Sequence, residues 1–427
     1  MSTTLLDALP AVPVRSRIHA ALATEDLRAI HALRAETFAP CKGCFECWVK
    51  TPGRCGMRDA ANPLMSDIIA STDIIWTTRV RFGCWDPIAK AALDRSIGLL
   101  SPFFEEVRGE THHKARYDHY PRWGVVAVEA PGTSEADRER FRHIVRRNVL
   151  NMHSEGPWVA FVREQDTQED VEQAIVEARA FPLPVAEVPV FTPPDPHGVP
   201  DPLDRPRHVV AWVGSAKATG ESTSEGLAQA LLHHLQTRGW TTELLHARRT
   251  VHLRREGAPA LVEAVSRADL LILASPVYVD CLPALVLSGL DRLANAGLRA
   301  PPAILPILQS GFPELSHSAL GLDVIARFAE STGSLWAGHL AVGGGGAFEG
   351  ADFTELNSKA GQQARALLQA AEALDRCRPV PDEAIERFGT PLLGPRMYRM
   401  AGQMGWLVQA WQHGTLGQLG DRPFSEA

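Results

Sequence analysis

Four cysteines lie within fifteen residues of the N-terminal half, at a spacing that could bind metal. The pattern is C-x2-C-x2-C-x7-C, in which three thiols recur at every third position and a fourth follows a Pro-Gly turn. Four thiolates are the ligand set of a [4Fe-4S] cluster. Structural zinc sites also use four thiolates, but usually as two separated C-x2-C pairs. We therefore expect a [4Fe-4S] cluster, with zinc or metal-free thiols as alternatives, at Cys41, Cys44, Cys47 and Cys55.

A loop of small and hydroxyl residues in the C-terminal half could bind a phosphate group. It reads GSAKATGESTS over residues 214–224 and lies between an apolar run and a helical pattern. Backbone N–H groups at the start of a helix favour an anion, and neighbouring hydroxyls add hydrogen bonds. The loop matches neither the Walker loop nor the G-x-G-x-x-G fingerprint. The alternative is a capped helix after a polar turn, because serine and threonine caps are common.

A second loop, SPVY over residues 275–278, could contact a flat heterocycle. It offers a proline-stiffened turn, exposed backbone amides and an aromatic ring that could stack on a ligand. In a doubly wound sheet of flavodoxin-like strand order, the ligand lies against the loops after strands one and three. The two loops would then meet at one crevice. The alternative is an ordinary strand-to-helix turn with a surface tyrosine.

The elements that position these loops follow from the hydrophobic pattern. The C-terminal half alternates helical patterns with five short apolar runs, at residues 208–214, 241–247, 269–275, 302–309 and 335–342. Short apolar strands between helices indicate a buried parallel sheet covered on both faces. The sequence therefore predicts a doubly wound α/β domain.

The N-terminal half repeats part of this pattern. The segment beginning at Asp73 matches the segment beginning at Asp269 at an offset of 196 residues, and Phe82 then falls on Tyr278. Fixed-offset similarity indicates two copies of one fold. About 40 residues precede Cys41, which leaves little room for a strand, a phosphate loop and a helix. We therefore expect the first copy to be truncated.

The chain's domain boundaries follow from a proline-rich stretch. Residues 181–207 contain nine prolines, too many for a helix or a central strand. With about 150 residues per domain as a guide, 427 residues suit two domains. We predict a first domain, a linker, a second domain and a helical C-terminal extension at residues 1–180, 181–207, 208–378 and 379–427.

Composition and charge exclude several classes of protein. The chain has 45% hydrophobic and 22% charged residues, which is typical of a globular protein with sizeable cores. Its net charge of −7 disfavours nucleic-acid binding, because no excess of positive charge is available for phosphates. No apolar run is long enough to cross a membrane, and no signal peptide is recognisable. Seven cysteines suit a reducing compartment, so we expect a cytoplasmic protein.

The second half resembles the NAD(P)H-dependent FMN reductase group of flavodoxin-like proteins. The resemblance lies in the loop from Gly214, the loop from Ser275, the helix ending in Leu-Asp-Arg at Arg292, and the turn from Gly311 to Glu314. The cysteine run is similar to that of the iron–sulfur flavoproteins, which carry a cluster on an FMN-binding domain of this fold. For the FMN phosphate, the resemblance implies Ser215, Lys217, Ser222, Thr223 and Ser224. For the isoalloxazine ring, it implies Ser275, Pro276, Val277, Tyr278, Gly311 and Phe312.

Together these patterns predict an FMN-dependent oxidoreductase that passes electrons between a nicotinamide donor and an acceptor through FMN and a [4Fe-4S] cluster. Catalysis then lies in the cofactors, and no catalytic side chain is assigned. The alternatives are a flavin or quinone reductase with a structural zinc or metal-free cysteine site, and a flavin-binding redox sensor without turnover. We expect the first half to have lost FMN binding. We also expect a homodimer with a small-molecule or protein redox partner, although two fused domains could already mimic a dimer.

Overall fold

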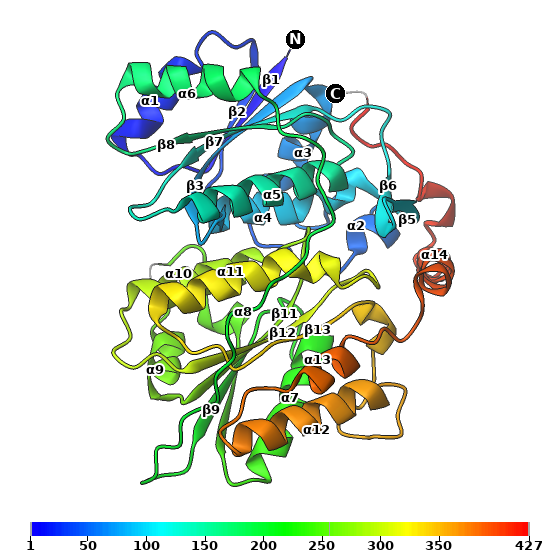
Figure 1. Cartoon of the computed structure of the whole chain (residues 1–427). Helices are drawn as coiled ribbons and strands as arrows, with labels where there is room; N and C mark the ends of the chain where they lie inside the picture. The colour runs from blue at the N-terminus through cyan, green and yellow to red at the C-terminus, as the bar shows by residue number, and fades with distance from the viewer. Residues whose placement is uncertain (1, 256, 426–427) are drawn as a thin grey trace. The chain divides into compact units, whose positions relative to one another are not determined.

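The computed structural model describes residues 2–255 and 257–425 as two compact units. The first unit comprises Met1–Val188 and Arg399–Ala427, and the second comprises Pro189–Tyr398. Both are α/β units with a parallel sheet between two layers of helices (Figure 1). Among the described residues, none of the helices has the length and apolar character required to span a membrane.

The second unit contains the five strands that the sequence predicts. They pair in the order β10-β9-β11-β12-β13, and every pair is parallel. This is the 2-1-3-4-5 order of the flavodoxin-like fold. The bounds are β9 (His208–Val213), β10 (Thr241–His246), β11 (Leu270–Pro276), β12 (Ala303–Gln309) and β13 (Leu340–Val342).

Helices cover both faces of this second sheet because its strands are apolar throughout. All seven residues of β11 are buried, as expected for a central strand. Figure 1 shows α10 and α11 on one face and α7, α12 and α13 on the other. The helices are α7 (Thr223–Gln236), α8 (Ala247–Thr250), α9 (Pro259–Arg267), α10 (Ala284–Asn295), α11 (Ser316–Thr332), α12 (Gly361–Asp375) and α13 (Asp382–Phe388).

The first unit has the same strand order, which corrects the expectation of a truncated copy. Its main sheet pairs as β2-β1-β3-β7-β8, all parallel, with β4 added antiparallel to β3. The 40 residues before the cysteines hold a strand, a helix and a second strand. Only five residues, 8–12, connect the first strand to its helix, so the reduction affects the loop that would hold a phosphate and not the sheet. The strands are β1 (Thr3–Asp7), β2 (Leu27–Ala32), β3 (Asp73–Arg81), β4 (Cys84–Trp85), β7 (Arg122–Val128) and β8 (Trp158–Val162).

Two further features of the first unit surround the cysteines. A separate antiparallel hairpin is formed by β5 (Leu100–Val107) and β6 (Glu110–Ala115). The C-terminal helix α14 (Pro395–Gln412) begins in the second unit and ends in the first. The other helices of the first unit are α1 (Pro13–Ala21), α2 (Glu46–Val49), α3 (Ala61–Ala70), α4 (Pro87–Arg95), α5 (Glu135–Asn151) and α6 (Gln168–Ala180).

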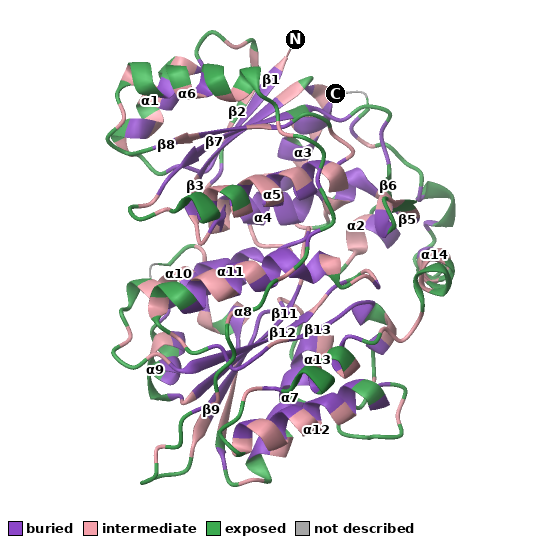
Figure 2. Ribbon diagram, in the orientation of Figure 1, coloured by how far each residue is buried: buried purple, intermediate pink, exposed green. Residues whose placement is uncertain are grey.

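Burial separates the two cores clearly. Figure 2 shows both sheets buried, with exposed residues on the outer sides of the helices and on the linker. In the second unit, the core runs through β9, β11, β12, α7 and α12. The first unit's corresponding core includes Leu5, Ile18, Val126 and Val162. Each unit therefore has its own hydrophobic core, as independently folding domains require.

Candidate functional site

The loops after β9 and β11 begin side by side at the carboxyl edge of the second sheet. The Gly214 amide donates to the Ala274 carbonyl at 2.7 Å. A Cβ atom at position 214 would lie 2.6 Å from Ser275 Oγ, so this close approach requires glycine. The structure thus brings together the two loops that the sequence singles out.

The start of α7 presents the hydroxyls of the first loop. Ser222 caps the helix, and its hydroxyl accepts the Glu225 amide at 3.1 Å. Thr223 donates to the Gly345 carbonyl at 3.2 Å, and Ser215 accepts the Lys217 amide at 3.3 Å. Ser224 is 1% exposed, and its hydroxyl has no hydrogen-bond partner among the described residues. A buried hydroxyl without a partner is costly unless a ligand satisfies it.

A buried carboxylate inside this loop is a feature that the sequence reasoning missed. Glu225 accepts the Gly220 amide at 2.7 Å, and its other oxygen lies 3.1 Å from His246 Nε2. The spacing Ser-x-x-Glu is that of a capping box, but this carboxylate bonds to Gly220 and not to the cap residue. Arg248 and Arg249 both donate to the Thr219 hydroxyl, at 2.9 and 3.0 Å. The loop therefore has cationic side chains nearby that offset the negative charge.

The loop after β11 is held in a strained turn. Tyr278 and Cys281 exchange both backbone hydrogen bonds, at 2.8 and 3.1 Å. The two central residues, Val279 and Asp280, have φ values of 51° and 56°. Positive φ at both positions is the geometry of a type I′ turn, which favours Asn and Gly. A β-branched residue there is strained, and such strain clusters at functional sites.

A buried polar pair supports this turn from behind. Asp280 and His317 are 5% and 1% exposed, and Asp280 Oδ1 lies 2.6 Å from His317 Nδ1. The His317 ring also lies 4.8 Å from the ring of Phe312. The pair thus links the turn after β11 to the loop after β12. Neither Asp280 nor His317 was identified from the sequence.

The loops after β12 and β13 close the same edge. A Cβ atom at Gly345 would lie 1.6 Å from Gln309 Oε1, so the glycine-rich loop approaches the end of β12 closely. Tyr398, at the start of α14, hydrogen-bonds through its hydroxyl to the Gly311 carbonyl. Burial and the charge of Glu314 raise the pKa of Tyr398 to about 12, so this hydroxyl stays protonated. Gly311 and Phe312 therefore lie next to an aromatic residue from the C-terminal extension.

The cysteine loop of the first unit contains four free thiols. Cys44 is exposed, and Cys41, Cys47 and Cys55 are partly buried. Burial raises the pKa of Cys41 to about 12, and burial together with the charges of the other three cysteines also raises the pKa of Cys47. The Gly43 amide donates to Cys41 Sγ at 3.5 Å. Within residues 2–255 and 257–425, no group of three or more His, Cys, Asp or Glu side chains is arranged to hold a metal ion.

One buried arginine clamps the two ends of the cysteine loop together. Arg95, at the end of α4, donates to both carboxylate oxygens of Asp59 at 2.8 and 2.9 Å. It also donates to the Ala39 carbonyl at 2.8 Å. Burial tends to raise the pKa of Asp59, but these bonds and the amides of Ala39 and Ala61 outweigh it and lower the pKa. The loop from residue 39 to residue 59 is thus closed at its base.

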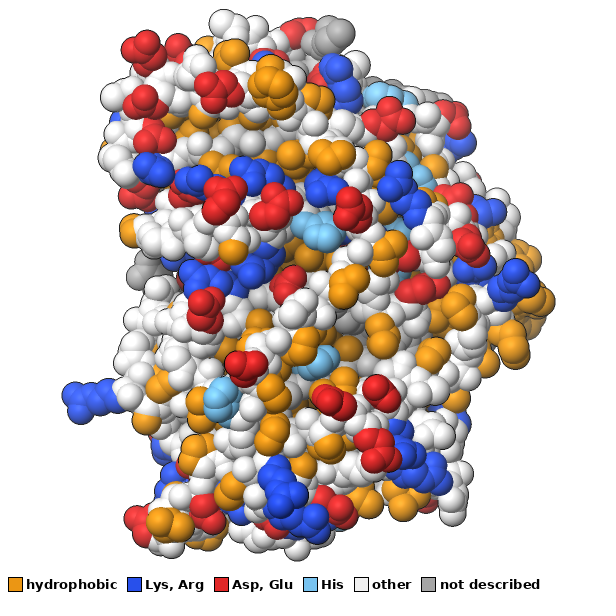
Figure 3. Space-filling view, in the orientation of Figure 1, with side chains coloured by type: hydrophobic (Ala, Val, Ile, Leu, Met, Phe, Trp, Pro, Cys, Tyr) orange, Lys and Arg blue, Asp and Glu red, His pale blue; other side chains and the backbone are white. Residues whose placement is uncertain are grey.

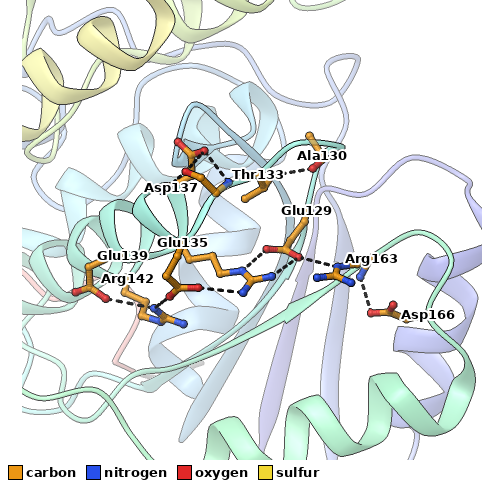
Figure 4. A network of polar contacts seen from close by, with 11 residues as sticks. Glu129, Ala130, Thr133, Glu135, Asp137, Glu139, Arg142, Arg163 and Asp166 are labelled. Carbon is orange, nitrogen blue, oxygen red and sulfur yellow. Dashed lines mark hydrogen bonds and ion pairs between the residues drawn. The ribbon is translucent and has the colours of Figure 1, made fainter. Parts of the chain in front are cut away.

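The carboxyl edge of the first sheet is lined with ion pairs. Buried Asp7 lies 2.6 Å from Arg15 Nε and accepts the Thr77 hydroxyl. Figure 4 shows Glu129, at the end of β7, in contact with Arg163 within a network of charged side chains. Glu129 also accepts from Arg138 at 2.5 and 3.0 Å. This edge therefore offers charged side chains already paired with one another, unlike the hydroxyl loop of the second unit.

Comparison with known proteins finds one family that is similar to part of the second unit. Residues 207–312 match the family described as NADPH-dependent FMN reductase. The matched segment runs from β9 to Phe312 and so contains every residue named above for the flavin. The match supports an enzyme that uses FMN and NAD(P)H. A comparison with curated proteins finds no match.

Solved structures similar to the chain each align with about two-fifths of it. An azoreductase from Bacillus anthracis str. Sterne is 13% identical over 40% of this chain and 97% of its own, with a TM-score of 0.29. An NAD(P)H:quinone oxidoreductase from Methanothermobacter marburgensis is 16% identical over 40% and 98%, with a TM-score of 0.29. The apo form of an NADH:FMN oxidoreductase is 21% identical over 42% and 94%, with a TM-score of 0.30. The strand order of each unit, and not these alignments, establishes the fold.

Proposed function

We propose that the second unit binds FMN and reduces a small-molecule or protein acceptor with electrons from NAD(P)H. The observation that carries this proposal is the meeting of Gly214 and Ser275 inside the segment that matches the FMN reductases. Bound FMN would accept a hydride and could release its electrons singly. For the protein's part, the phosphate would be held by Ser215, Lys217, Ser222, Thr223 and Ser224, and the ring by Ser275, Pro276, Val277, Tyr278, Gly311 and Phe312.

The residues of the first loop fit a phosphate in chemistry. The unpartnered Ser224 hydroxyl is buried at the start of a 14-residue helix, where backbone amides favour an anion. Lys217, Arg248 and Arg249 supply positive charge near the loop. Glu225 opposes an anion, because its carboxylate lies within the same loop. The balance of these charges sets how tightly a phosphate binds.

The flavin proposal is tested on the purified full-length chain. We expect a yellow protein that releases FMN on denaturation and that oxidises NADPH or NADH in the presence of a quinone or ferricyanide. A titration of flavin fluorescence with FMN and with riboflavin measures the contribution of the phosphate. A chain that binds neither flavin contradicts the proposal. Tight FMN binding without turnover assigns the protein as a redox sensor instead.

We further infer that the first unit holds a [4Fe-4S] cluster on Cys41, Cys44, Cys47 and Cys55. Their C-x2-C-x2-C-x7-C spacing supports this, as does the N–H bond to the Cys41 sulfur. Zinc is the alternative occupant, because four thiolates also bind a tetrahedral zinc ion. A bound cluster would carry one electron at a time, which suits a role between a nicotinamide donor and a one-electron acceptor.

The cluster proposal is tested by metal analysis of anaerobically purified protein. We expect about four iron atoms and four sulfides per chain, and loss of both in Cys47→Ser. Cys377→Ser is the matched control, because Cys377 is exposed and distant in sequence from the loop. Zinc in place of iron, or neither metal, favours the simpler reductase. The number of free cysteines suits a reducing compartment, so the proposal places the protein in the cytoplasm.

A further inference from the structure

The outward face of α14 carries a row of exposed apolar side chains. Met400, Met404, Val408 and Trp411 are 70%, 61%, 49% and 71% exposed. Their spacing of four, four and three residues places them on one side of the helix. In Figure 2 this helix is coloured as exposed, and Figure 3 shows hydrophobic side chains gathered at the right edge over it. Contiguous exposed apolar surface on a folded protein marks an interaction site.

The opposite face of α14 is already packed against other elements of the first unit. A Cβ atom at Gly402 would lie 2.5 Å from the Phe104 ring, so the helix backbone lies directly on the β5–β6 hairpin. The Trp406 ring contacts Phe45 and Trp48, with centroids 5.6 and 5.2 Å apart. The helix is therefore fixed on one side, and the exposed apolar row on its other side forms a surface that can contact a partner.

We propose that a second copy of this chain covers the row, so that α14 pairs antiparallel with its counterpart about a two-fold axis. Apolar residues three and four positions apart are the spacing with which two helices interlock. The helix has no acidic residue and only two basic ones, Arg396 and Arg399. Arg399 is paired with Glu106 at 2.6 Å, and an antiparallel arrangement keeps the two Arg396 side chains at opposite ends.

Charge also argues against a membrane as the occupant. Helices that lie on membranes combine an apolar face with a polar face rich in lysine and arginine. Here the face opposite the row is packed against the first unit, its Arg399 is paired with Glu106, and the whole chain has a net charge of −7. A self-complementary contact needs no opposite charge on a partner, which fits a row formed by methionine, valine and tryptophan alone.

The proposed dimer contact also affects the cysteine loop, because the inner face of α14 packs on that loop. Trp406 packs on Trp48 of α2, and the Thr415 hydroxyl donates to the Val49 carbonyl at 2.5 Å. Pairing of two copies through the outer face would therefore hold the inner face, and the loop beneath it, more firmly in place.

The first test is the mass of the full chain in solution. Light scattering should give a mass near twice the 46.5 kDa of one chain. The double variant Met400→Glu with Met404→Glu should raise the dimer dissociation constant about a hundredfold or more, because two buried anchors are lost on each side. Leu203→Glu is the control, since Leu203 is 91% exposed in the linker and outside the row. A monomeric wild-type chain, or dimers that persist in the double variant, overturns the proposal.

A second test identifies the geometry without weakening the contact. Near the middle of an antiparallel pair, a cysteine at position 404 faces its own counterpart. Met404→Cys in a Cys377→Ser background should therefore form a disulfide between chains on mild oxidation, and Leu203→Cys should not. Failure of Met404→Cys to cross-link contradicts the arrangement. Sedimentation of the wild type with phosphatidylglycerol vesicles, lost in the glutamate variant, would assign the row to a membrane and overturn the dimer.

Discussion

Ser224 is the side chain in the hydroxyl loop whose behaviour tests the phosphate site most directly. Its hydroxyl is buried without a hydrogen-bond partner among the described residues, so a bound phosphate would supply one. A hydrogen bond to a charged group contributes about 1.5–3 kcal/mol, which corresponds to roughly tenfold or more in affinity. We expect Ser224→Ala to weaken FMN binding by about tenfold and to leave riboflavin binding unchanged. Fluorescence titration checks both.

The control for this measurement is Ser266→Ala on α9, where the hydroxyl already donates to the Glu263 carbonyl. This variant should bind FMN as the wild type does. If Ser224→Ala also binds FMN normally, the phosphate lies elsewhere.

Glu225 should have the opposite effect on the same titration. Its carboxylate is buried in the loop and would repel a phosphate dianion across a short distance. Glu225→Gln keeps an oxygen for the Gly220 amide but removes the charge. We therefore expect FMN to bind several-fold more tightly, with a smaller effect at high salt because the charge is then screened. Weaker binding would show that the contacts of the Glu225 side chain with Gly220 and His246 order the loop more than its charge repels the ligand.

The turn from Tyr278 to Cys281 is an element under strain, and the strain can be relieved by one substitution. A non-glycine residue in the left-handed region costs about 1–2 kcal/mol. Val279→Gly should raise the free energy of unfolding by roughly 1 kcal/mol in a denaturant titration. If the strain serves to present Tyr278, the same variant should bind FMN less tightly. A variant that is more stable and binds FMN unchanged would show that the strain has no part in the site.

The clamp at the base of the cysteine loop makes a second prediction about an element. Asp59→Asn removes the charge that pairs with buried Arg95 and leaves the arginine without its counter-ion. We expect the variant to lose iron to a chelator at least about tenfold faster than the wild type, because breaking one side of a buried pair is costly. Asp166→Asn, in the turn that follows β8, is the control. An unchanged rate of iron loss contradicts the role of the clamp.

The pH dependence of the clamp has a definite sign. The pKa of Asp59 is lowered in the folded protein, so the folded state favours the ionised carboxylate. Its contribution to stability is therefore complete above the ordinary pKa near 4 and is lost as the pH falls through the lowered value. Acid release of iron from the wild type should occur at lower pH than release from Asp59→Asn.

Local signals explain which parts of these elements could be predicted from sequence. The strands of the second sheet are apolar runs bounded by turns, and the hydroxyl loop is contiguous, so both are visible in the sequence. The Asp280–His317 contact joins residues 37 apart, and the Tyr398–Gly311 contact joins residues 87 apart. The sequence does not indicate that these residues are in contact, because only folding brings them together.

The first two strands of the first unit, β1 and β2, were missed for a different reason. The segment β2 reads LRAIHA, which is rich in residues that favour helices, and its burial alternates along an edge of the sheet. Pairing with β1 overrides that local preference. The connection after β1 is short and has no hydroxyl loop. In the sequence, this shortness was interpreted as the absence of a strand and a helix.

Across the whole chain, two copies of one fold carry different chemical groups at their edges. The second unit has the hydroxyl loop and the strained turn, whereas the first has ion pairs at its carboxyl edge and the cysteines beside it. A duplicated fold can lose one site in each copy when the other copy keeps it. The C-terminal segment does not belong to this repeat, and its contacts lie on the cysteine loop.

That C-terminal segment makes a prediction for the chain as a whole, because residues 415–424 return to cover the cysteine loop. Arg116 donates to the Leu419 and Asp421 carbonyls at 3.1 and 2.7 Å, and Arg54 donates to the Pro423 carbonyl at 2.9 Å. Ending the chain after Gly414 removes these contacts and leaves the elements of the second unit in place. In metal-free protein, the partly buried thiols of the loop should then react with a thiol reagent at least about tenfold faster.

The remaining cysteines of the same chain provide the internal standard for this experiment. Exposed Cys377 should react at the same rate in both chains, and buried Cys84 and Cys281 should stay slow. FMN affinity should not change, because the proposed flavin residues all lie within the second unit. If the loop thiols of the truncated chain react with the reagent at the original rate, the contacts of Arg54 and Arg116 do not protect the loop. If FMN affinity fell as well, the two units would depend on each other in a way that their separate cores do not require.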